Sequence, residues 1–371
     1  MPVKAMVIRD TDRMFYEEHL APWLPERILD CHVHVCLDRH FGAVSPERRR
    51  EIWAIEAGIS QSWGDLRASY SLLFPDQTVS ALAFGGIYKE HDTHASNDYL
   101  LTGIQDEENR AHGLFVTRPD WDTELLVQAM ANGFIGIKPY PDLATCDAHS
   151  VGIYDFLPRR HLEAVNQARG IVMMHLPRAG RLPDPDNVRE LLEISNDYPD
   201  TTLIVAHIGR SFCLPTAKRG LGHFTDQSNI YFDTAANLNT DAIQFAIETV
   251  GPGRILFGSD MPITLMRGVR EHRGDQYFNF TDGPYSWNSD RKSPEEEARY
   301  TFFIYEGLRA LVQAALRSGC GPTALRGMLL ENGESLLDRV SASVRASTRP
   351  DSSLHSPQVL AAAQGLMGSD I

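Results

Sequence analysis

Four histidines and an aspartate each follow a short apolar run of the kind that forms buried strands, and together they could bind a metal ion. They are His32, His34, His175, His207 and Asp260. His32 and His34 are separated by one residue, so in a strand both side chains point to the same face. Imidazoles and carboxylates are ligands that zinc, iron and manganese take in proteins. A lone histidine at a strand end more often has a structural role, but the conjunction across separate strands predicts a metal centre at one rim.

The elements that must position these residues are short β-branched runs that alternate with helical patterns, which is typical of repeated βα units. Eight such units predict a closed (β/α)8 TIM barrel, in which active sites form at the carboxyl ends of the strands. An open doubly wound sheet is the competing fold, but no Gly-x-Gly-x-x-Gly motif follows the first strand. The predicted strands cover residues 27–35, 78–85, 112–117, 134–139, 170–175, 202–207, 229–233 and 254–260.

Helix-capping residues stand before several of the helical patterns. Ser45, followed by a proline in the first turn, predicts one helix start. Ser96 is expected to cap a helix over residues 97–110, and Asp122 is expected to cap one over residues 123–132.

The predicted barrel domain covers residues 27–340, after an N-terminal extension over residues 1–26. Residues 341–371 are rich in serine and alanine, which predicts a tail that is mobile or loosely docked. A long connection over residues 261–294 follows the last strand directly. Connections of this length are usually functional lids or disordered segments.

The composition limits the function classes. A formal net charge of −14 argues against a nucleic-acid partner, because binding of phosphate depends on Lys and Arg. The 5 cysteines are odd in number and scattered, which does not indicate a disulfide framework. Residues 1–12 lack the apolar core of a signal peptide, and no segment approaches a membrane span of about 20 apolar residues. We therefore expect a cytoplasmic protein that acts on a small molecule without a membrane partner, with a homodimer as the default assembly.

The motifs His32-Val33-His34 and Gly258-Ser259-Asp260-Met261-Pro262, taken with His175 and His207, resemble those of the amidohydrolase superfamily. The resemblance is to its amidohydrolase-2 branch, the relatives of aminocarboxymuconate-semialdehyde decarboxylase, and it covers residues 24–337. The motif set is specific for the superfamily and weak for any one reaction.

This resemblance implies that His32, His34, His175 and Asp260 bind one divalent metal, with zinc the first expectation and manganese or iron the alternatives. It places His207 beside the metal or the substrate, as a general acid/base or an electrostatic stabiliser. Such a metal lowers the pKa of bound water towards about 7. Asp260 could then orient that water and accept its proton, and a protonated His207 could stabilise a developing oxyanion.

Lys138 ends the predicted fourth strand, where some members of the superfamily carry a carbamylated lysine that bridges two metals. Others in this branch keep a lysine there with one metal, and we interpret Lys138 as a contact to the substrate or to a metal ligand. Tyr140 follows it as a candidate substrate contact. Arg178 and Arg210 each stand three residues after a site histidine and could clamp a substrate carboxylate, although exposure at the surface explains them equally well.

Two further groups are less specific. His91 and His94 form a His-x-x-His pair, but on a loop this spacing fixes no common direction, so we do not expect a metal site there. Tyr277, Tyr285 and Trp287 in the long connection could line a planar substrate, but packing within a lid is the safer interpretation.

The prediction for the reaction is a metal-dependent hydrolase that cleaves an amide or lactone-type bond in a small organic substrate that could carry a carboxylate. The alternative is a non-oxidative decarboxylase of an unsaturated or aromatic acid, which the same branch contains. Many of those decarboxylases have a glutamate at the first histidine and several lack the strand-four lysine, so His32 and Lys138 favour the hydrolase. A barrel that binds a ligand without catalysis would have lost a metal ligand, and none is missing.

Overall fold

A parallel barrel of eight strands forms the centre of the computed structural model, which describes residues 6–146, 151–283, 285–288 and 290–348. Each strand pairs in parallel with the next one along the chain. The predicted TIM barrel is therefore confirmed. The strands are β1 (Arg27–His34), β2 (Thr78–Phe84), β3 (Ala111–Thr117), β4 (Gly136–Pro139), β5 (Ile171–Met174), β6 (Thr202–Val205), β7 (Ile230–Asp233) and β8 (Ile255–Leu256).

Backbone hydrogen bonds between the first and last strand segments close the barrel. The amide of Cys31 donates to the carbonyl of Phe257 (2.8 Å), and the amide of His34 donates to that of Met261 (2.9 Å). The predicted eighth strand over residues 254–260 is longer than β8. The reason is that the pairing with β7 ends at Leu256, after which the amide of Phe257 donates to the carbonyl of Met328 (2.9 Å).

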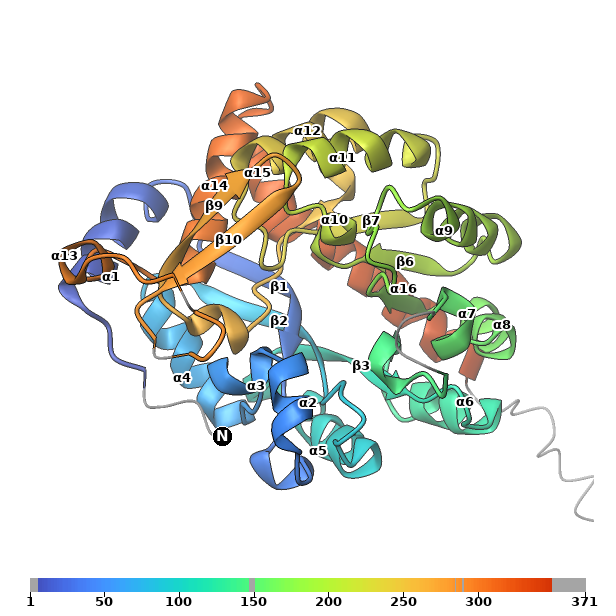
Figure 1. Cartoon of the computed structure of the whole chain (residues 1–371). Helices are drawn as coiled ribbons and strands as arrows, with labels where there is room; N and C mark the ends of the chain where they lie inside the picture. Colours follow the sequence, from blue (N-terminus) through green and yellow to red (C-terminus); the bar gives the residue numbers. More distant parts are fainter. Residues whose placement is uncertain (1–5, 147–150, 284, 289, 349–371) are drawn as a thin grey trace, which may run out of the picture.

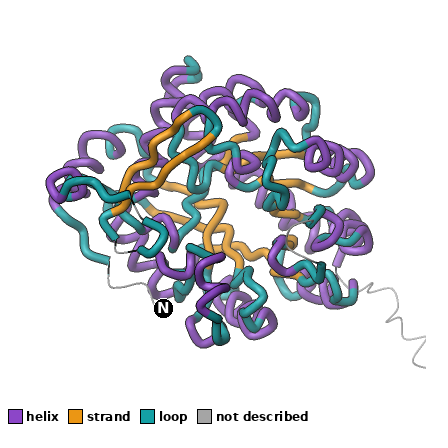
Figure 2. Tube along the Cα trace, in the orientation of Figure 1, coloured by secondary structure: helices purple, strands orange, loops and turns teal. Residues whose placement is uncertain are grey.

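Helices surround the strands, as Figures 1 and 2 show, so strands such as β5 and β6 are buried along their whole length. The longer helices are α4 (Trp63–Leu73), α5 (Thr93–Ile104), α6 (Thr123–Ala131), α8 (Arg159–Ala168), α9 (Pro185–Asp197), α12 (Thr240–Val250), α14 (Phe303–Arg317) and α16 (Asn332–Thr348). The shorter ones are α1 (Asp10–Phe15), α2 (Pro46–Glu51), α3 (Ala54–Ala57), α7 (Ile153–Phe156), α10 (His207–Arg210), α11 (Leu214–Gly220), α13 (Pro294–Glu297) and α15 (Gly321–Arg326). In the described part of the chain, no helix is both long and apolar enough to span a membrane.

The predicted helix caps have different outcomes. Ser45 caps α2 as predicted, and its hydroxyl accepts a hydrogen bond from the amide of Arg48 (3.2 Å). The prediction for Ser96 is wrong, because α5 begins at Thr93 and is capped by Asp92. Ser96 lies inside that helix, buried, and its hydroxyl accepts from the amide of Gly86 at the end of β2. Helix α6 begins after Asp122, but the Asp122 side chain makes no capping hydrogen bond.

The long connection after β8 contains an antiparallel hairpin, β9 (Gly268–Arg273) and β10 (Gln276–Thr281), which Figure 1 shows in orange. The sequence analysis did not predict it. The N-terminal extension holds the start of this hairpin, since the buried carboxylate of Asp12 accepts from Arg267 (2.6 Å) and from the hydroxyl of Thr301 (2.9 Å).

The C-terminal helix α16 crosses position 340, where we placed the end of the barrel domain. Three of its residues around this position are buried: Val340, Ser341 and Val344. This part of the serine- and alanine-rich segment therefore packs against the rest of the protein. The part of the predicted tail from residue 349 onward lies outside the described residues.

Candidate active site

A buried carboxylate, Asp30, fixes the ends of β1 and of the segment after β8 to each other. It accepts hydrogen bonds from the backbone amides of His32 (3.1 Å) and Ser259 (2.8 Å) and from the hydroxyl of Tyr70 (2.8 Å). Burial raises the pKa of Asp30 to about 6, although the contacts from Ser259 oppose that change. The sequence analysis did not single out Asp30, which positions the site without facing it.

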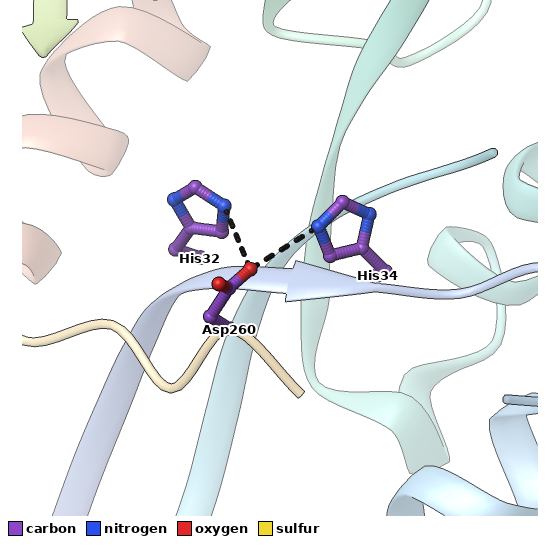
Figure 3. Close-up of side chains that lie close together, drawn as sticks. All are labelled: His32, His34 and Asp260. Carbon is purple, nitrogen blue, oxygen red and sulfur yellow. Dashed lines mark ion pairs between the residues drawn. The ribbon is translucent and has the colours of Figure 1, made fainter. Parts of the chain in front are cut away.

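His32 and His34 point from β1 towards the same carboxylate, that of Asp260. Figure 3 shows the two rings on one side of the strand, with both dashed lines meeting at one oxygen. The Nε2 atoms of His32 and His34 lie 3.4 Å and 3.3 Å from Oδ1 of Asp260. Burial alone would raise the pKa of Asp260, but His207 and the two histidines of β1 outweigh it and lower the pKa, so this carboxylate is ionised.

Asp233, at the end of β7, orients two of the predicted site histidines. Its carboxylate accepts from Nδ1 of His32 (2.9 Å) and from the backbone amides of His207 (2.8 Å) and Ala235 (3.1 Å). Because Nδ1 of the neutral His32 donates its proton to Asp233, Nε2 presents a lone pair to the Asp260 oxygen. The sequence analysis missed Asp233, although its place at the end of a predicted strand was the signal that could have found it.

The turn after β6 carries His207 into the site through an unusual backbone conformation. Residues 207–210 all have positive φ, between 51° and 63°. Three of these four residues are not glycine, and left-handed backbone of this kind is costly outside glycine and is concentrated at functional sites. The Nδ1 atom of His207 donates to the carbonyl of Ala235 (2.8 Å), and burial lowers the pKa of His207, so the ring is neutral with its lone pair at Nε2.

The donor set fits a divalent metal. Ligand atoms of His32, His34 and Asp260 all lie within 4.8 Å of one another. The 3.3–3.4 Å separations match those between two ligands that each lie about 2.1 Å from a tetrahedral metal. At His32, whose Nδ1 donates to Asp233, the Nε2 lone pair faces the Asp260 oxygen, and the two repel unless a cation lies between them. His175 is outside this tight set, but its ring lies 5.4 Å from that of His207, and its buried Nδ1 has no hydrogen-bond partner within the described ranges.

A cavity of about 270 Å³ opens onto this cluster, and three of the four predicted substrate contacts line it: Lys138, Tyr140 and Arg210. The Nζ atom of Lys138 is buried and has no hydrogen-bond partner among the residues that the structure describes. Burial lowers the pKa of Lys138 to about 8, although the charges of Asp233 and Asp260 oppose that change.

Arg178, the fourth predicted contact, does not line the cavity. Its two Nη atoms bind both carboxylate oxygens of Glu190 at 2.7 Å, and Nη1 also binds Asn187 (2.9 Å). The prediction is therefore corrected: the three-residue spacing after His175 places Arg178 against α9, where a buried carboxylate takes up its charge.

Of the two histidines in the His-x-x-His pair, one lines the cavity and the other does not. His91 lines the cavity, but its Nδ1 accepts from the amide of Tyr88 (3.2 Å), while His94 stacks on Trp121 with ring centroids 4.3 Å apart. No metal cluster in the described part of the chain includes either histidine.

Of the three aromatic residues singled out in the long connection, one lines the cavity and two do not. Tyr277 lines the cavity. Tyr285 stacks on Trp287 (4.9 Å between ring centroids), which in turn packs edge-on against Trp53 (5.3 Å). Tyr285 and Trp287 therefore pack within the long connection and against the segment before α3, as predicted for aromatic residues of a lid.

Arg270, on β9, is a cavity-lining residue that the sequence analysis missed. Its guanidinium lies 4.6 Å from the ring centroid of Tyr277 and 4.9 Å from that of Phe212. Its Nε donates to Asn279 (2.8 Å) and its Nη1 to the carbonyl of Ala236 (2.6 Å). A lone arginine in a long connection carries no signal in the sequence, because only the hairpin turns it towards the barrel.

Comparison with known proteins gives a family and a fold. The model of a family described as amidohydrolase (amidohydrolase-2) matches residues 29–280. A curated relative, 6-methylsalicylic acid decarboxylase of Penicillium expansum, is 34% identical over a stretch that covers 19% of this chain and 26% of the relative. The match thus spans about a quarter of that relative's length.

Solved structures with the same fold include members that are named for different reactions. A probable 2-pyrone-4,6-dicarboxylic acid hydrolase from Acinetobacter baumannii, with citric acid bound, has a TM-score of 0.54 at 16% identity, covering 84% of this chain and 99% of that one. The 5-carboxyvanillate decarboxylase from Novosphingobium aromaticivorans, in complex with manganese and 4-hydroxy-3-methoxy-5-nitrobenzoic acid, has a TM-score of 0.53 at 13% identity, covering 84% and 96%. At these identities the likeness establishes the barrel and leaves the reaction open.

Proposed function

This chain belongs to the amidohydrolase-2 family, as its motifs predicted, and on that premise we propose that it is a metal-dependent hydrolase of an amide or lactone-type bond in a small organic acid. His32, His34, His175 and Asp260 would hold one divalent metal, zinc or manganese. The metal would supply Lewis-acid polarisation of the scissile carbonyl and a lowered pKa for a water molecule.

One observation carries the hydrolase assignment. Asp260 is kept ionised inside the cavity, and only its Oδ1 lies against the histidines of β1. Its Oδ2 has no hydrogen-bond partner in the described part of the chain and is therefore available to accept the proton of an attacking water. Since His207 is neutral with a lone pair at Nε2, it can take up that proton and pass it to the leaving group. Of the two roles expected from the sequence, we therefore propose the general acid/base role for His207 rather than that of a protonated electrostatic stabiliser.

A decarboxylase is the second candidate, and the short match to 6-methylsalicylic acid decarboxylase favours it. The two reactions make different demands on the solvent. Hydrolysis adds one oxygen atom from water to the product, whereas decarboxylation releases carbon dioxide and adds only a proton.

The deciding experiment is turnover of a panel of lactones, amides and unsaturated or aromatic acids in ¹⁸O-labelled water. We expect one ¹⁸O atom in the new carboxyl group of the product and no carbon dioxide, read by mass spectrometry and gas analysis. The same incubation with heat-denatured protein controls for spontaneous hydrolysis. Stoichiometric carbon dioxide with an unlabelled organic product would reject the hydrolase and leave the decarboxylase.

For His207→Asn we expect turnover to fall by about 10²-fold or more while the metal content is unchanged, because the variant loses a proton carrier and keeps all four proposed ligands. Metal content by elemental analysis and kcat on the same sample measure the two effects. His223→Asn, on the helical segment before β7 and away from the cavity, is the matched control and should retain full turnover. Loss of metal from the His207 variant would identify this histidine as a ligand instead.

A further inference from the structure

Three arginines, Arg181, Arg210 and Arg270, interact with Tyr277, which lines the cavity. Arg210 and Arg270 line the cavity itself. The guanidinium of Arg181 lies 5.2 Å from the ring centroid of Tyr277 and 5.8 Å from that of Phe212, the same two rings that Arg270 contacts. The positive charge of Arg181 acts unfavourably on both Arg210 and Arg270, so the three form one electrostatic cluster.

These three differ from other arginines near the barrel rim, which are neutralised by carboxylates. Arg178 binds Glu190, and Arg48 binds Glu90 and Asp142. In the described part of the chain, none of the three arginines of the cluster forms an ion pair. This is notable in a protein with 49 acidic and 35 basic residues, where carboxylates outnumber the cations available to them.

Neutral acceptors hold two of the guanidinium groups and leave part of each free. Nη1 of Arg210 donates to the carbonyl of Leu176 (3.0 Å), while its Nε and Nη2 have no partner among the described residues. Nε and Nη1 of Arg270 bind an amide and a carbonyl oxygen, and Nη2 has no partner there. Arg210 therefore keeps its Nε–Nη2 edge, which can bind a carboxylate in bidentate fashion, and Arg270 keeps a further donor in the lining of the same cavity.

The positive charge of this cluster is left without compensation inside the protein. Burial lowers the pKa of Arg270 to about 10, and Asp260, the carboxylate that acts on it, is already shared with His32 and His34. The three arginines are half-buried, and keeping unpaired charges of one sign together in such positions is unfavourable unless an anion binds them. A bound anion would remove that cost. Since two of the arginines line the cavity, the anion would be a group of the molecule that binds there.

We propose that Arg210 and Arg270, with Arg181 behind them, form an anion site that binds a substrate carboxylate remote from the bond that reacts. The substrate is then a small organic acid whose reacting end lies at Asp260 and whose carboxylate lies at the β9–β10 hairpin. The position of the reacting end rests on the proposed function, whereas the anion site does not.

The test is calorimetric binding of two inert probes to the metal-loaded protein, benzoate and benzene-1,3-dicarboxylate. One carboxylate of either probe can bind at the metal, so the gain from the second carboxylate reports on the arginines. We expect the dicarboxylate to bind at least about tenfold more tightly than benzoate, and Arg270→Gln and Arg210→Gln to reduce that ratio to about twofold or less. Arg273→Gln, an exposed arginine on the same strand, is the matched control and should keep the wild-type ratio.

Thermal melting by circular dichroism establishes that each variant is folded, and Arg210→Gln and Arg270→Lys decide the question if Arg270→Gln does not fold. A wild-type ratio near one, or a ratio that survives in every folded variant, would overturn the proposal. Inorganic phosphate that displaces the dicarboxylate at lower concentration than benzoate does would also overturn it, in favour of a phosphate site. Because the binding test measures no turnover, its result is independent of the ¹⁸O experiment. The anion site can be confirmed when the hydrolase is rejected, and it can be rejected when the hydrolase is confirmed.

Discussion

Asp260→Asn is expected to lower turnover by about 10³-fold or more while the protein keeps at least part of its metal. The asparagine retains the size of the side chain and one oxygen towards His32 and His34, so the donor set is conserved. It loses the negative charge and the free oxygen that accepts the proton from water. The loss therefore falls on the chemical step and much less on substrate affinity.

Metal content by elemental analysis, kcat and KM on the same preparation separate these effects. Asp275→Asn, in the turn between β9 and β10 and paired there with the exposed Arg219, is a matched control that should leave all three unchanged. An Asp260 variant with full metal content and near-normal turnover would remove Asp260 from the proton-transfer role that we assign to it.

Chelation of the metal is expected to abolish turnover, and one equivalent of zinc or manganese per chain should restore it. Two groups of metal-type ligands are present among the described residues, and in one of them, His32 with His207 and Asp233, the Asp233 carboxylate is already satisfied by hydrogen bonds. A single equivalent follows from this arrangement. The expected loss is the largest of all, because the metal both polarises the carbonyl and lowers the pKa of water.

Titration of the metal-free protein, followed by activity and by elemental analysis, gives the stoichiometry. Restoration that requires two equivalents would contradict the one-metal site. It would make Lys138, whose buried Nζ has no hydrogen-bond partner among the described residues, the first candidate for a bridging ligand. Full activity of metal-free protein would contradict the metal requirement itself. Magnesium, which prefers oxygen donors, serves as the control ion and should restore little activity to a histidine-rich site.

Local patterns in the sequence determined the barrel and the rim residues of this protein. Apolar runs of strand length, each followed by a helical pattern, have few other folds open to them. Within that fold the carboxyl ends of the strands lie at one rim, so the sequence alone assigns His32, His34, His207 and Asp260 to that rim. The caps were less certain: Ser45 was correct and Ser96 was not, since both are serines before a helical pattern and only the packing of α5 on β2 distinguishes them.

Only the tertiary structure decided which charged side chains face the cavity and which are neutralised elsewhere. Arg178 and Arg210 have the same spacing after a site histidine, yet Arg178 binds Glu190 while Arg210 is turned into the cavity by the left-handed turn at residues 207–210. Arg270 lines the cavity because it lies on a hairpin that was not predicted from the sequence. Asp233 became part of the site because the end of β7 lies close to His32 of β1. The physical reason is that strand and helix formation depend on residues close in the sequence, whereas the partner of a charge depends on groups that only the closed barrel brings within a few ångströms.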